Sequence, residues 1–307
     1  MKLTVQIAVT NLFAEPDVAS ELVSQLLLGA PVTVEDRRDG PTPGRPTWLR
    51  GRGPADYVGW TPADSLVETA ELEPSPAGAG LKPAPTPPSR ISALYANLRH
   101  APSRRCGPVI CASFGTILPV ADRDDEWVGL ALPGGRTGWV EESRVEQETP
   151  RPLPRLLDTA RLFLGVPYLW GGTSSFGIDC SGYVQAVFGA HGIPLPRDAN
   201  DQAALGAPID RDAIETGDLL YFAAMPEASR AGITHVALAV DRDNILHALG
   251  GRCVVETPVD AGGMFWGARR LQESEHSPNP AKAAFDEGGM DYAVRSVSDS
   301  ALSGGTG

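Results

Sequence analysis

The sequence predicts an α+β domain preceded by two small all-β barrels. Two copies of one pattern of short apolar runs between turn signals occupy the first 150 residues. A helical apolar pattern follows at residues 180–192, and two strand-like runs lie within residues 232–249. A length of 307 residues suits two or three domains, and an apolar content of 42% is enough for ordinary cores.

Seven residues of the first copy recur in the second copy at two constant shifts. Four are shifted by 86 positions and three by 79 positions. The pairs are Asn11 and Asn97, Pro16 and Pro102, Gly29 and Gly115, Val34 and Val120, Trp48 and Trp127, Gly59 and Gly138, and Trp60 and Trp139. The change of shift falls on a Gly-Pro-rich loop at residues 39–47, where two copies of one fold tolerate a difference in length.

These patterns predict the order of the domains. We expect the first barrel at residues 1–72, the second barrel at 91–148 and the α+β domain at 151–273. Residues 73–90 are dense in Pro, Ala and Gly and predict an extended linker, and the polar residues 274–307 predict a disordered tail. Residues 15–29 have helical spacing, so we expect a helical insertion or a long loop in the first barrel.

Cys180 lies where a glycine-rich loop meets the predicted helix. Residues 183–188 form an apolar stripe, and a Gly-x-Pro sequence at residues 192–194 ends the pattern. The N-terminus of a helix favours an anion, so we expect a lowered thiol pKa and a reactive thiolate. For a cysteine considered alone, a buried structural role is the commoner one.

Two histidines lie on the strand-like runs after Cys180. Residues 232–241 alternate, with both faces largely apolar, and predict a central strand that carries His235. A turn at residues 241–244 leads into a second strand that carries His247, so a hairpin would bring the two imidazoles together. A lone histidine on a strand is more often packed or exposed than catalytic. Together with Cys180, the pair favours nucleophilic catalysis with a base and an orienting group.

The motifs PYLWGG, DCSGYVQ, LPRDANDQ, TGDLLYF, THVALAV and ILHAL occur in the order typical of NlpC-type cysteine peptidases. These are papain-like enzymes that act on bacterial cell-wall peptides. The resemblance covers residues 154–270 and implies a papain-like α+β catalytic domain. It also implies that Cys180 is the nucleophile, His235 the base and His247 the orienting residue. Tyr168 matches the tyrosine whose hydroxyl helps the backbone at Cys180 to hold the oxyanion.

The same resemblance gives a substrate. LPRDANDQ resembles the branch that cuts γ-D-glutamyl bonds in peptides whose N-terminal L-Ala is free. We therefore expect the substrate to be the murein peptide L-Ala-γ-D-Glu-diamino acid, in which the diamino acid is meso-diaminopimelate or lysine. The candidate substrate-binding residues are Tyr57, Trp170, Asp179, Ser181, Arg197 and Asp198. Asp179 is the candidate for the charge that meets the ammonium, whereas Arg197 and Asp198 either brace their loop or contact a substrate carboxylate.

The two N-terminal copies resemble bacterial SH3-like domains. LYANLRHAPS and GRTGWV are typical of the first strand and last hairpin of that family, and VTNLFAEP and DYVGW are their counterparts in the first copy. The resemblance implies SH3-like barrels, which serve as stability modules, as cell-wall anchors or as a wall that closes one end of the catalytic cleft. The third role limits the substrate to peptides with a free N-terminus.

Composition excludes several other functions. A net charge of −12 argues against nucleic acid and anionic membrane as partners. No stretch approaches 18 apolar residues, and the apolar start is broken by Gln6 and Asn11, so we expect neither a membrane span nor a signal peptide and place the protein in the cytoplasm. Cys106 and Cys111 are spaced for a hairpin disulfide or half a metal site. No second pair completes a zinc site, so we expect reduced thiols, no metal and no cofactor.

Other functions remain open at this stage. The chain can be an exported general peptidoglycan hydrolase or an amidase, an acyl transferase that acts on lipids, or an inactive protein that binds cell-wall fragments. The sequence does not give the oligomeric state.

Overall fold

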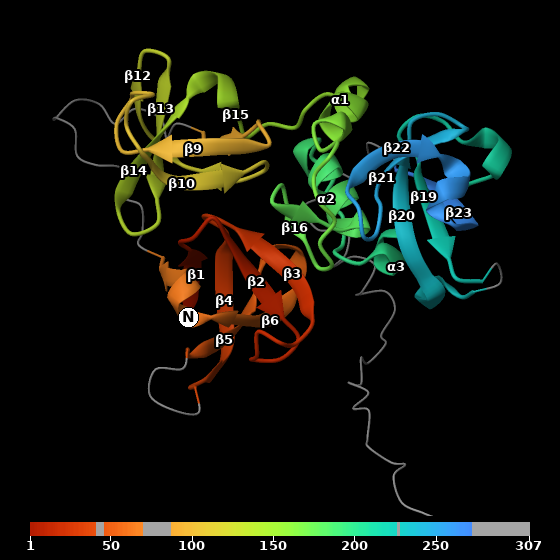
Figure 1. The fold of residues 1–307 in the computed structure, drawn as a ribbon, viewed down its shortest axis with the longest axis horizontal. Helices are drawn as coiled ribbons and strands as arrows, with labels where there is room; N and C mark the ends of the chain where they lie inside the picture. The colour runs from red at the N-terminus through yellow and green to blue at the C-terminus, as the bar shows by residue number, and fades with distance from the viewer. Residues whose placement is uncertain (41–45, 70–86, 226–227, 272–307) are drawn as a thin grey trace, which may run out of the picture.

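The computed structural model describes residues 1–40, 46–69, 87–225 and 228–271, which form three units. Two are barrels of strands and the third is a mixed unit of helices and one large sheet (Figure 1). The fold class predicted from the sequence is therefore confirmed. The predicted tail, residues 274–307, and most of the predicted linker lie outside the described residues.

The first barrel has one seven-stranded sheet in the order β3-β2-β6-β5-β4-β1-β7. Its strands are β1 (Lys2–Val5), β2 (Val9–Phe13), β3 (Leu22–Leu27), β4 (Pro31–Arg38), β5 (Trp48–Arg52), β6 (Val58–Pro62) and β7 (Leu66–Glu68). Leucines and valines from these strands fill its interior. Trp48 and Trp60 are both buried, and Trp48 meets Phe13 edge to face.

The prediction of a helical insertion at residues 15–29 is wrong. Turns cover residues 15–20, and β3 then runs as an extended strand that pairs with β2. Three successive residues of β3, Ser24 to Leu26, are buried, because one face of the strand packs into the barrel and the other packs against the third unit. A strand buried on both faces loses its period of two, and this explains the misleading spacing.

The second barrel has a five-stranded sheet, β10-β9-β14-β13-β12, and a three-stranded sheet, β11-β8-β15. Its strands are β8 (Ser89–Ile91), β9 (Tyr95–Arg99), β10 (Pro108–Ser113), β11 (Ile117–Leu118), β12 (Val120–Asp124), β13 (Trp127–Leu132), β14 (Arg136–Glu141) and β15 (Val145–Gln147). Strand β8 begins inside the stretch predicted as linker, and its Arg90 is buried against the third unit.

The internal repeat is visible in the strands themselves. Strands β2 and β3 correspond to β9 and β10 at the shift of 86 residues, with the same lengths. After the loop at residues 39–47, strands β5 and β6 correspond to β13 and β14 at the shift of 79 residues. The two barrels are therefore two copies of one fold.

The third unit has a six-stranded antiparallel sheet in the order β18-β23-β19-β20-β21-β22, with helices packed against it (Figure 1). Its elements are α1 (Leu156–Arg161), β16 (Thr173–Ser174), β17 (Gly177–Ile178), α2 (Cys180–Ala190), α3 (Ala199–Gln202), β18 (Ala207–Ile209), β19 (Leu219–Ala223), β20 (Ile233–Ala239), β21 (Asn244–Ala248), β22 (Val254–Pro258) and β23 (Met264–Arg270). The predicted helix and the two predicted strands are present, and β20 is an interior strand as expected.

Short 3-10 turns connect the strands. They are η1 (Pro54–Asp56), η2 (Ala63–Ser65), η3 (Glu142–Arg144), η4 (Leu153–Arg155), η5 (Arg211–Ala213), η6 (Arg230–Gly232) and η7 (Val259–Gly262). No helix in the described ranges has the length and hydrophobicity that a membrane crossing requires.

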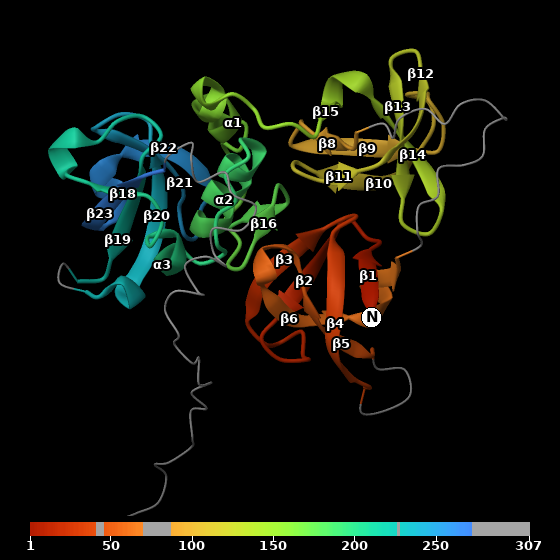
Figure 2. The same cartoon turned by 180° about the vertical axis from the view of Figure 1, so that it is seen from behind.

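The small hairpin β16–β17, just before α2, lies beside both barrels (Figure 2). The side-chain carbonyl of Gln25 in β3 accepts hydrogen bonds from the Thr173 amide at 3.1 Å and the Ser174 hydroxyl at 3.0 Å. In the second barrel, the hydroxyl of Ser113 accepts from the Ser175 amide at 2.9 Å. Both barrels thus hold the segment that leads into Cys180.

Candidate active site

Cys180 is the first residue of helix α2. The preceding residue, Asp179, is extended, and its carboxylate accepts a hydrogen bond from the Gly182 amide at 2.7 Å, which caps the helix. The helix ends at Ala190, and Gly192 follows with φ of 79°, a conformation that glycine adopts without strain. Local capping at both ends therefore fixes where the cysteine sits.

The thiol of Cys180 is buried between α2 and β20. The side chain is 8% exposed and belongs to the same apolar cluster as Val236, the residue after His235. Burial, together with the charge of Asp179, raises the pKa of the thiol to about 11, although hydrogen bonds from the amides of Val236 and Ser181 act in the opposite direction. The expectation of a lowered thiol pKa is wrong, because burial outweighs the start of the helix.

The two histidines lie side by side on adjacent strands, as predicted. Nε2 of His235 is 2.8 Å from Nδ1 of His247. Burial lowers the pKa of each imidazole to about 4, and the charge of His247 contributes to the shift of His235. In the free protein at neutral pH, the thiol and both imidazoles are therefore uncharged. His235 is a base ready to accept a proton, with Nδ1 as the ring nitrogen that His247 does not occupy.

Tyr168 lies near the thiol. The residue is half-buried, and its amide donates to the carbonyl of Arg252 at 2.9 Å, which ties it to the connection between β21 and β22. Burial raises the pKa of its phenol to about 12, and charge on Cys180 is the next contribution. The phenol therefore stays protonated at neutral pH and can donate a hydrogen bond beside the sulfur.

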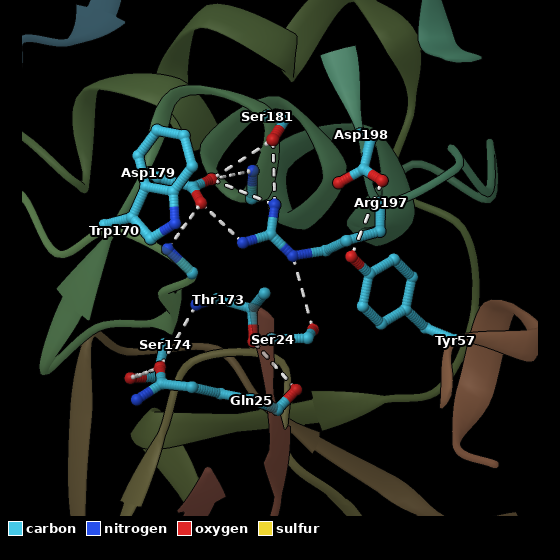
Figure 3. A network of polar contacts seen from close by, with 12 residues as sticks. Ser24, Gln25, Tyr57, Trp170, Thr173, Ser174, Asp179, Ser181, Arg197 and Asp198 are labelled. Atoms are coloured by element: carbon cyan, nitrogen blue, oxygen red, sulfur yellow. Dashed lines mark hydrogen bonds and ion pairs between the residues drawn. The ribbon is translucent and has the colours of Figure 1, made fainter. Parts of the chain in front are cut away.

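Asp179 and Arg197 form a buried ion pair at the start of α2 (Figure 3). Arg197 donates from Nη1 to Asp179 Oδ1 at 3.0 Å and from Nη2 to Oδ2 at 2.5 Å. The same Nη1 donates to Ser181 Oγ at 2.8 Å, and Nε donates to Ser24 Oγ of the first barrel at 3.2 Å. The arginine therefore links the helix that carries the cysteine to the first barrel.

The oxygens of Asp179 also accept from the amides of Gly171 and Gly182 and from the hydroxyl of Ser181. Together with Arg197, these donors occupy and neutralise the carboxylate. The structure therefore does not support Asp179 as the charge that meets a substrate ammonium. Asp179 and Arg197 brace the nucleophile helix, and Ser181 takes part in the same network.

A second acidic group lies at the seam between the first barrel and the third unit (Figure 3). The hydroxyl of Tyr57 donates to Asp198 Oδ2 at 3.5 Å, and burial raises the pKa of Asp198. The indole of Trp170, which is 60% exposed, donates to Glu21 Oε1 at 2.9 Å. The pKa of Tyr57 is raised to about 12, first by burial and then by the charge of Asp198, with a smaller contribution from Glu21.

The structure thus separates the predicted site residues into three groups. His235 and His247 are in direct contact, and Cys180 accepts a hydrogen bond from the amide of Val236, the residue after His235. Tyr168 lies near enough to Cys180 for charge on the sulfur to raise the pKa of the phenol. Tyr57 and Asp198 meet at the seam, and Trp170 lies there with Glu21. Asp179, Ser181 and Arg197 form the bracing network. Sequence reasoning missed Glu21, because its partner Trp170 lies in a different unit of the chain.

The described part of the chain has no group of three or more His, Cys, Asp or Glu side chains placed to hold a metal ion. All four cysteines, Cys106, Cys111, Cys180 and Cys253, are free thiols. A thiol, a pair of hydrogen-bonded imidazoles and a phenol are a set of groups suited to acyl transfer by a nucleophile and a base.

Three family models match the three units. Residues 165–271 match the NlpC/P60 family. Residues 12–66 match the bacterial dipeptidyl-peptidase Sh3 domain, and residues 91–147 match the YKFC SH3b2 domain.

Curated relatives and a solved structure are similar to this chain over most of its length. A gamma-D-glutamyl-L-lysine dipeptidyl-peptidase of Bacillus cereus is 32% identical over 269 residues, which are 82% of this chain and 76% of the relative. Dipeptidyl-peptidase 6 of Lysinibacillus sphaericus is 27% identical over 81% of this chain and 89% of the relative. The crystal structure of an NlpC/P60 family protein from Bacillus cereus matches with a TM-score of 0.75 at 25% identity, over 88% of this chain and 99% of that one.

Proposed function

Because this chain belongs to the NlpC/P60 family and is a cell-wall peptidase, we propose that it cuts the γ-D-glutamyl-L-diamino acid bond of murein peptides with a free N-terminal L-Ala. The names of two relatives, a gamma-D-glutamyl-L-lysine dipeptidyl-peptidase and dipeptidyl-peptidase 6, support a substrate of this kind. The peptides would be fragments released from the wall, and the enzyme would serve their recycling in the cytoplasm.

In this proposal, Cys180 is the nucleophile and His235 is the base. His235 takes the thiol proton at Nδ1, and the sulfur attacks the γ-carbonyl carbon of D-Glu. The amide of Cys180 and the hydroxyl of Tyr168 donate to the oxyanion that develops on the carbonyl oxygen. The contribution of Cys180 charge to the raised pKa of Tyr168 supports this placement of the hydroxyl.

The tetrahedral intermediate then collapses. The C–N bond breaks, and His235 returns its proton to the departing amine of the diamino acid. Water, deprotonated by the same imidazole, attacks the thioester, so that L-Ala-D-Glu leaves and the thiol is restored. The raised pKa of the thiol and the lowered pKa of His235 support a proton transfer that accompanies the attack.

The requirement for a free N-terminal amine is supported by the contact between Tyr57 and Asp198 at the seam. Among the described residues, the Asp198 carboxylate has one side-chain hydrogen bond, from Tyr57, while the neighbouring guanidinium of Arg197 is committed to Asp179. A partly buried carboxylate with so few donors has acceptor capacity for an ammonium group. Glu21, on the same side of the barrel, adds a second negative charge. In this proposal, the first barrel is the wall that meets the substrate N-terminus.

Paired peptides test this function. The peptides are L-Ala-γ-D-Glu-L-Lys and L-Ala-γ-D-Glu-meso-diaminopimelate, each with a free and an acetylated N-terminus, and mass spectrometry identifies the products. The proposal expects L-Ala-D-Glu from the free peptides and little cleavage of the acetylated ones. Equal rates on free and acetylated peptides would favour a general wall hydrolase, and cleavage at another bond would refute the γ-glutamyl assignment.

A further inference from the structure

The hydrogen bonds behind His235 continue past His247 to a threonine. Thr257 lies on β22, which pairs with β21 so that His247 stands opposite Val255 and Ile245 opposite Thr257. Residues two apart on a strand share a face, so Thr257 and His247 project to the same side of the sheet. The hydroxyl of Thr257 is 3.1 Å from Nε2 of His247, and it donates to the carbonyl of Pro258 at 3.2 Å.

The direction of these bonds decides whether His235 can act as a base. A neutral imidazole has one N–H and one lone pair, so each histidine donates from one nitrogen and accepts at the other. His235 has to present the lone pair of Nδ1 to the thiol, so its proton lies on Nε2 and is donated to Nδ1 of His247. His247 then has its proton on Nε2, where Thr257 is the acceptor.

The Pro258 carbonyl favours this direction, because it gives the threonine proton an acceptor. When the proton of the hydroxyl points to Pro258, a lone pair of Oγ1 is left for His247. In the opposite direction, Thr257 would donate to His247, His247 would donate from Nδ1 to His235, and His235 would have its proton on Nδ1. That tautomer cannot take the thiol proton.

We propose that Thr257 is a positioning residue that, through His247, holds His235 in the tautomer with a free lone pair toward Cys180. The inference rests on the proposed roles of Cys180 and His235. His247 is fully buried, so its N–H needs a partner inside the protein. Without the threonine hydroxyl, the N–H on Nε2 would be unsatisfied, and moving the proton to Nδ1 would remove that cost while disabling the base.

Three variants test the proposal. Thr257→Val removes the hydroxyl and keeps the branched shape, whereas Thr257→Ser keeps the hydroxyl. Thr216→Val is the control, because the Thr216 hydroxyl donates to the Val240 carbonyl at an exposed position of the same unit. Steady-state kinetics gives kcat and KM, and nitrogen-15 spectra of labelled histidines report which ring nitrogen of His247 has the proton.

The valine variant is expected to lose about tenfold or more in kcat with KM within about twofold, and its His247 proton moves from Nε2 to Nδ1. The serine variant and the Thr216 control keep kcat within about threefold and keep the proton on Nε2. An unchanged kcat in the valine variant, or a lost kcat with the His247 proton still on Nε2, would overturn the proposal. The spectra do not require turnover, so they remain decisive even if Cys180→Ala showed that the proposed chemistry is wrong.

Discussion

The two barrels are copies of one fold that meet the catalytic unit in different ways. Both use the same strand of the repeat, because β3 of the first barrel and β10 of the second lie against neighbouring residues of the segment before α2. Gln25 binds Thr173 and Ser174, and Ser113 binds Ser175. Docking is therefore common to the two copies.

The residues that reach the site are not common to them. The repeat shifts that align β3 with β10 and β6 with β14 place Gly107 where the first barrel has Glu21 and Arg136 where it has Tyr57. Neither replacement offers a carboxylate or a phenol. The comparison teaches that duplication supplied two similar supports, and that Glu21 and Tyr57, the seam residues proposed to meet the substrate, belong to the first.

The largest expected effect comes from the catalytic unit alone. Cys180→Ala removes the sulfur that is proposed to form the acyl-enzyme, and removal of a nucleophile costs about 10⁴-fold or more in kcat. Cleavage of the free tripeptide followed by mass spectrometry measures the loss, and circular dichroism checks the fold. Substantial turnover by this variant would show that Cys180 is not the nucleophile. Cys253→Ala is the matched control and should keep activity.

The second effect concerns the link between α2 and the first barrel. Arg197→Met leaves the Asp179 carboxylate buried without its cation, which costs about 3–5 kcal/mol of unfolding free energy. Urea denaturation measures this loss. Arg161→Met is the control, because its pair with Glu256 is exposed and contributes no more than about 1 kcal/mol. Equal midpoints for the two variants would show that the buried pair is not a structural link.

The third effect tests whether the first barrel, and not the second, contributes to binding of the substrate N-terminus. Asp198→Asn keeps the size of the side chain and removes the charge that is proposed to meet the ammonium, so kcat/KM for the free tripeptide falls about tenfold or more. Tyr57→Phe lowers it less, because only a hydroxyl is lost. Arg136→Ala, at the position of the second barrel that matches Tyr57, leaves kcat/KM unchanged. An effect of Arg136→Ala as large as that of Tyr57→Phe would contradict the comparison.

Sequence and structure agree where the signal is local. The helix after Cys180 and the strands of His235 and His247 follow from periodicity and turn residues, and the repeat shifts match the strands closely. The contact between Glu21 and Trp170 at the seam does not follow from the sequence, because the two residues lie 149 residues apart and belong to different units. The raised pKa of the Cys180 thiol does not follow from the sequence either, because burial outweighs the effect of the helix N-terminus. Contacts between units and degrees of burial arise from the assembled fold, so no local sequence pattern predicts them.

The fourth effect is the pH dependence, which we expect the catalytic unit to set. The pKa of His235 is lowered to about 4, so the imidazole stays neutral as pH falls from 6.5 to 5 and kcat/KM changes by less than about threefold. A base with the ordinary pKa of about 6.5 would lose about sixteenfold over the same interval. Rates on the free tripeptide between pH 4 and 8 decide between the two. Tyr57→Phe should leave the acid limb in place, and a limb near pH 6.5 would show that His235 is not buried as a neutral base.

The smallest effect on turnover is expected in the second barrel. The fully buried hydroxyl of Ser113 accepts from the Ser175 amide, so Ser113→Ala leaves that amide unsatisfied and lowers the unfolding free energy by about 1–3 kcal/mol. Because Ser175 lies two residues beyond the contact of Gln25 with Thr173, the first barrel still holds the segment, and kcat/KM stays within about twofold. Ser103→Ala, on an exposed turn of the same barrel, is the control and changes stability by less than about 0.5 kcal/mol. A large loss of kcat/KM with little loss of stability would show that the second barrel also shapes the site, and the division of roles between the copies would then be wrong.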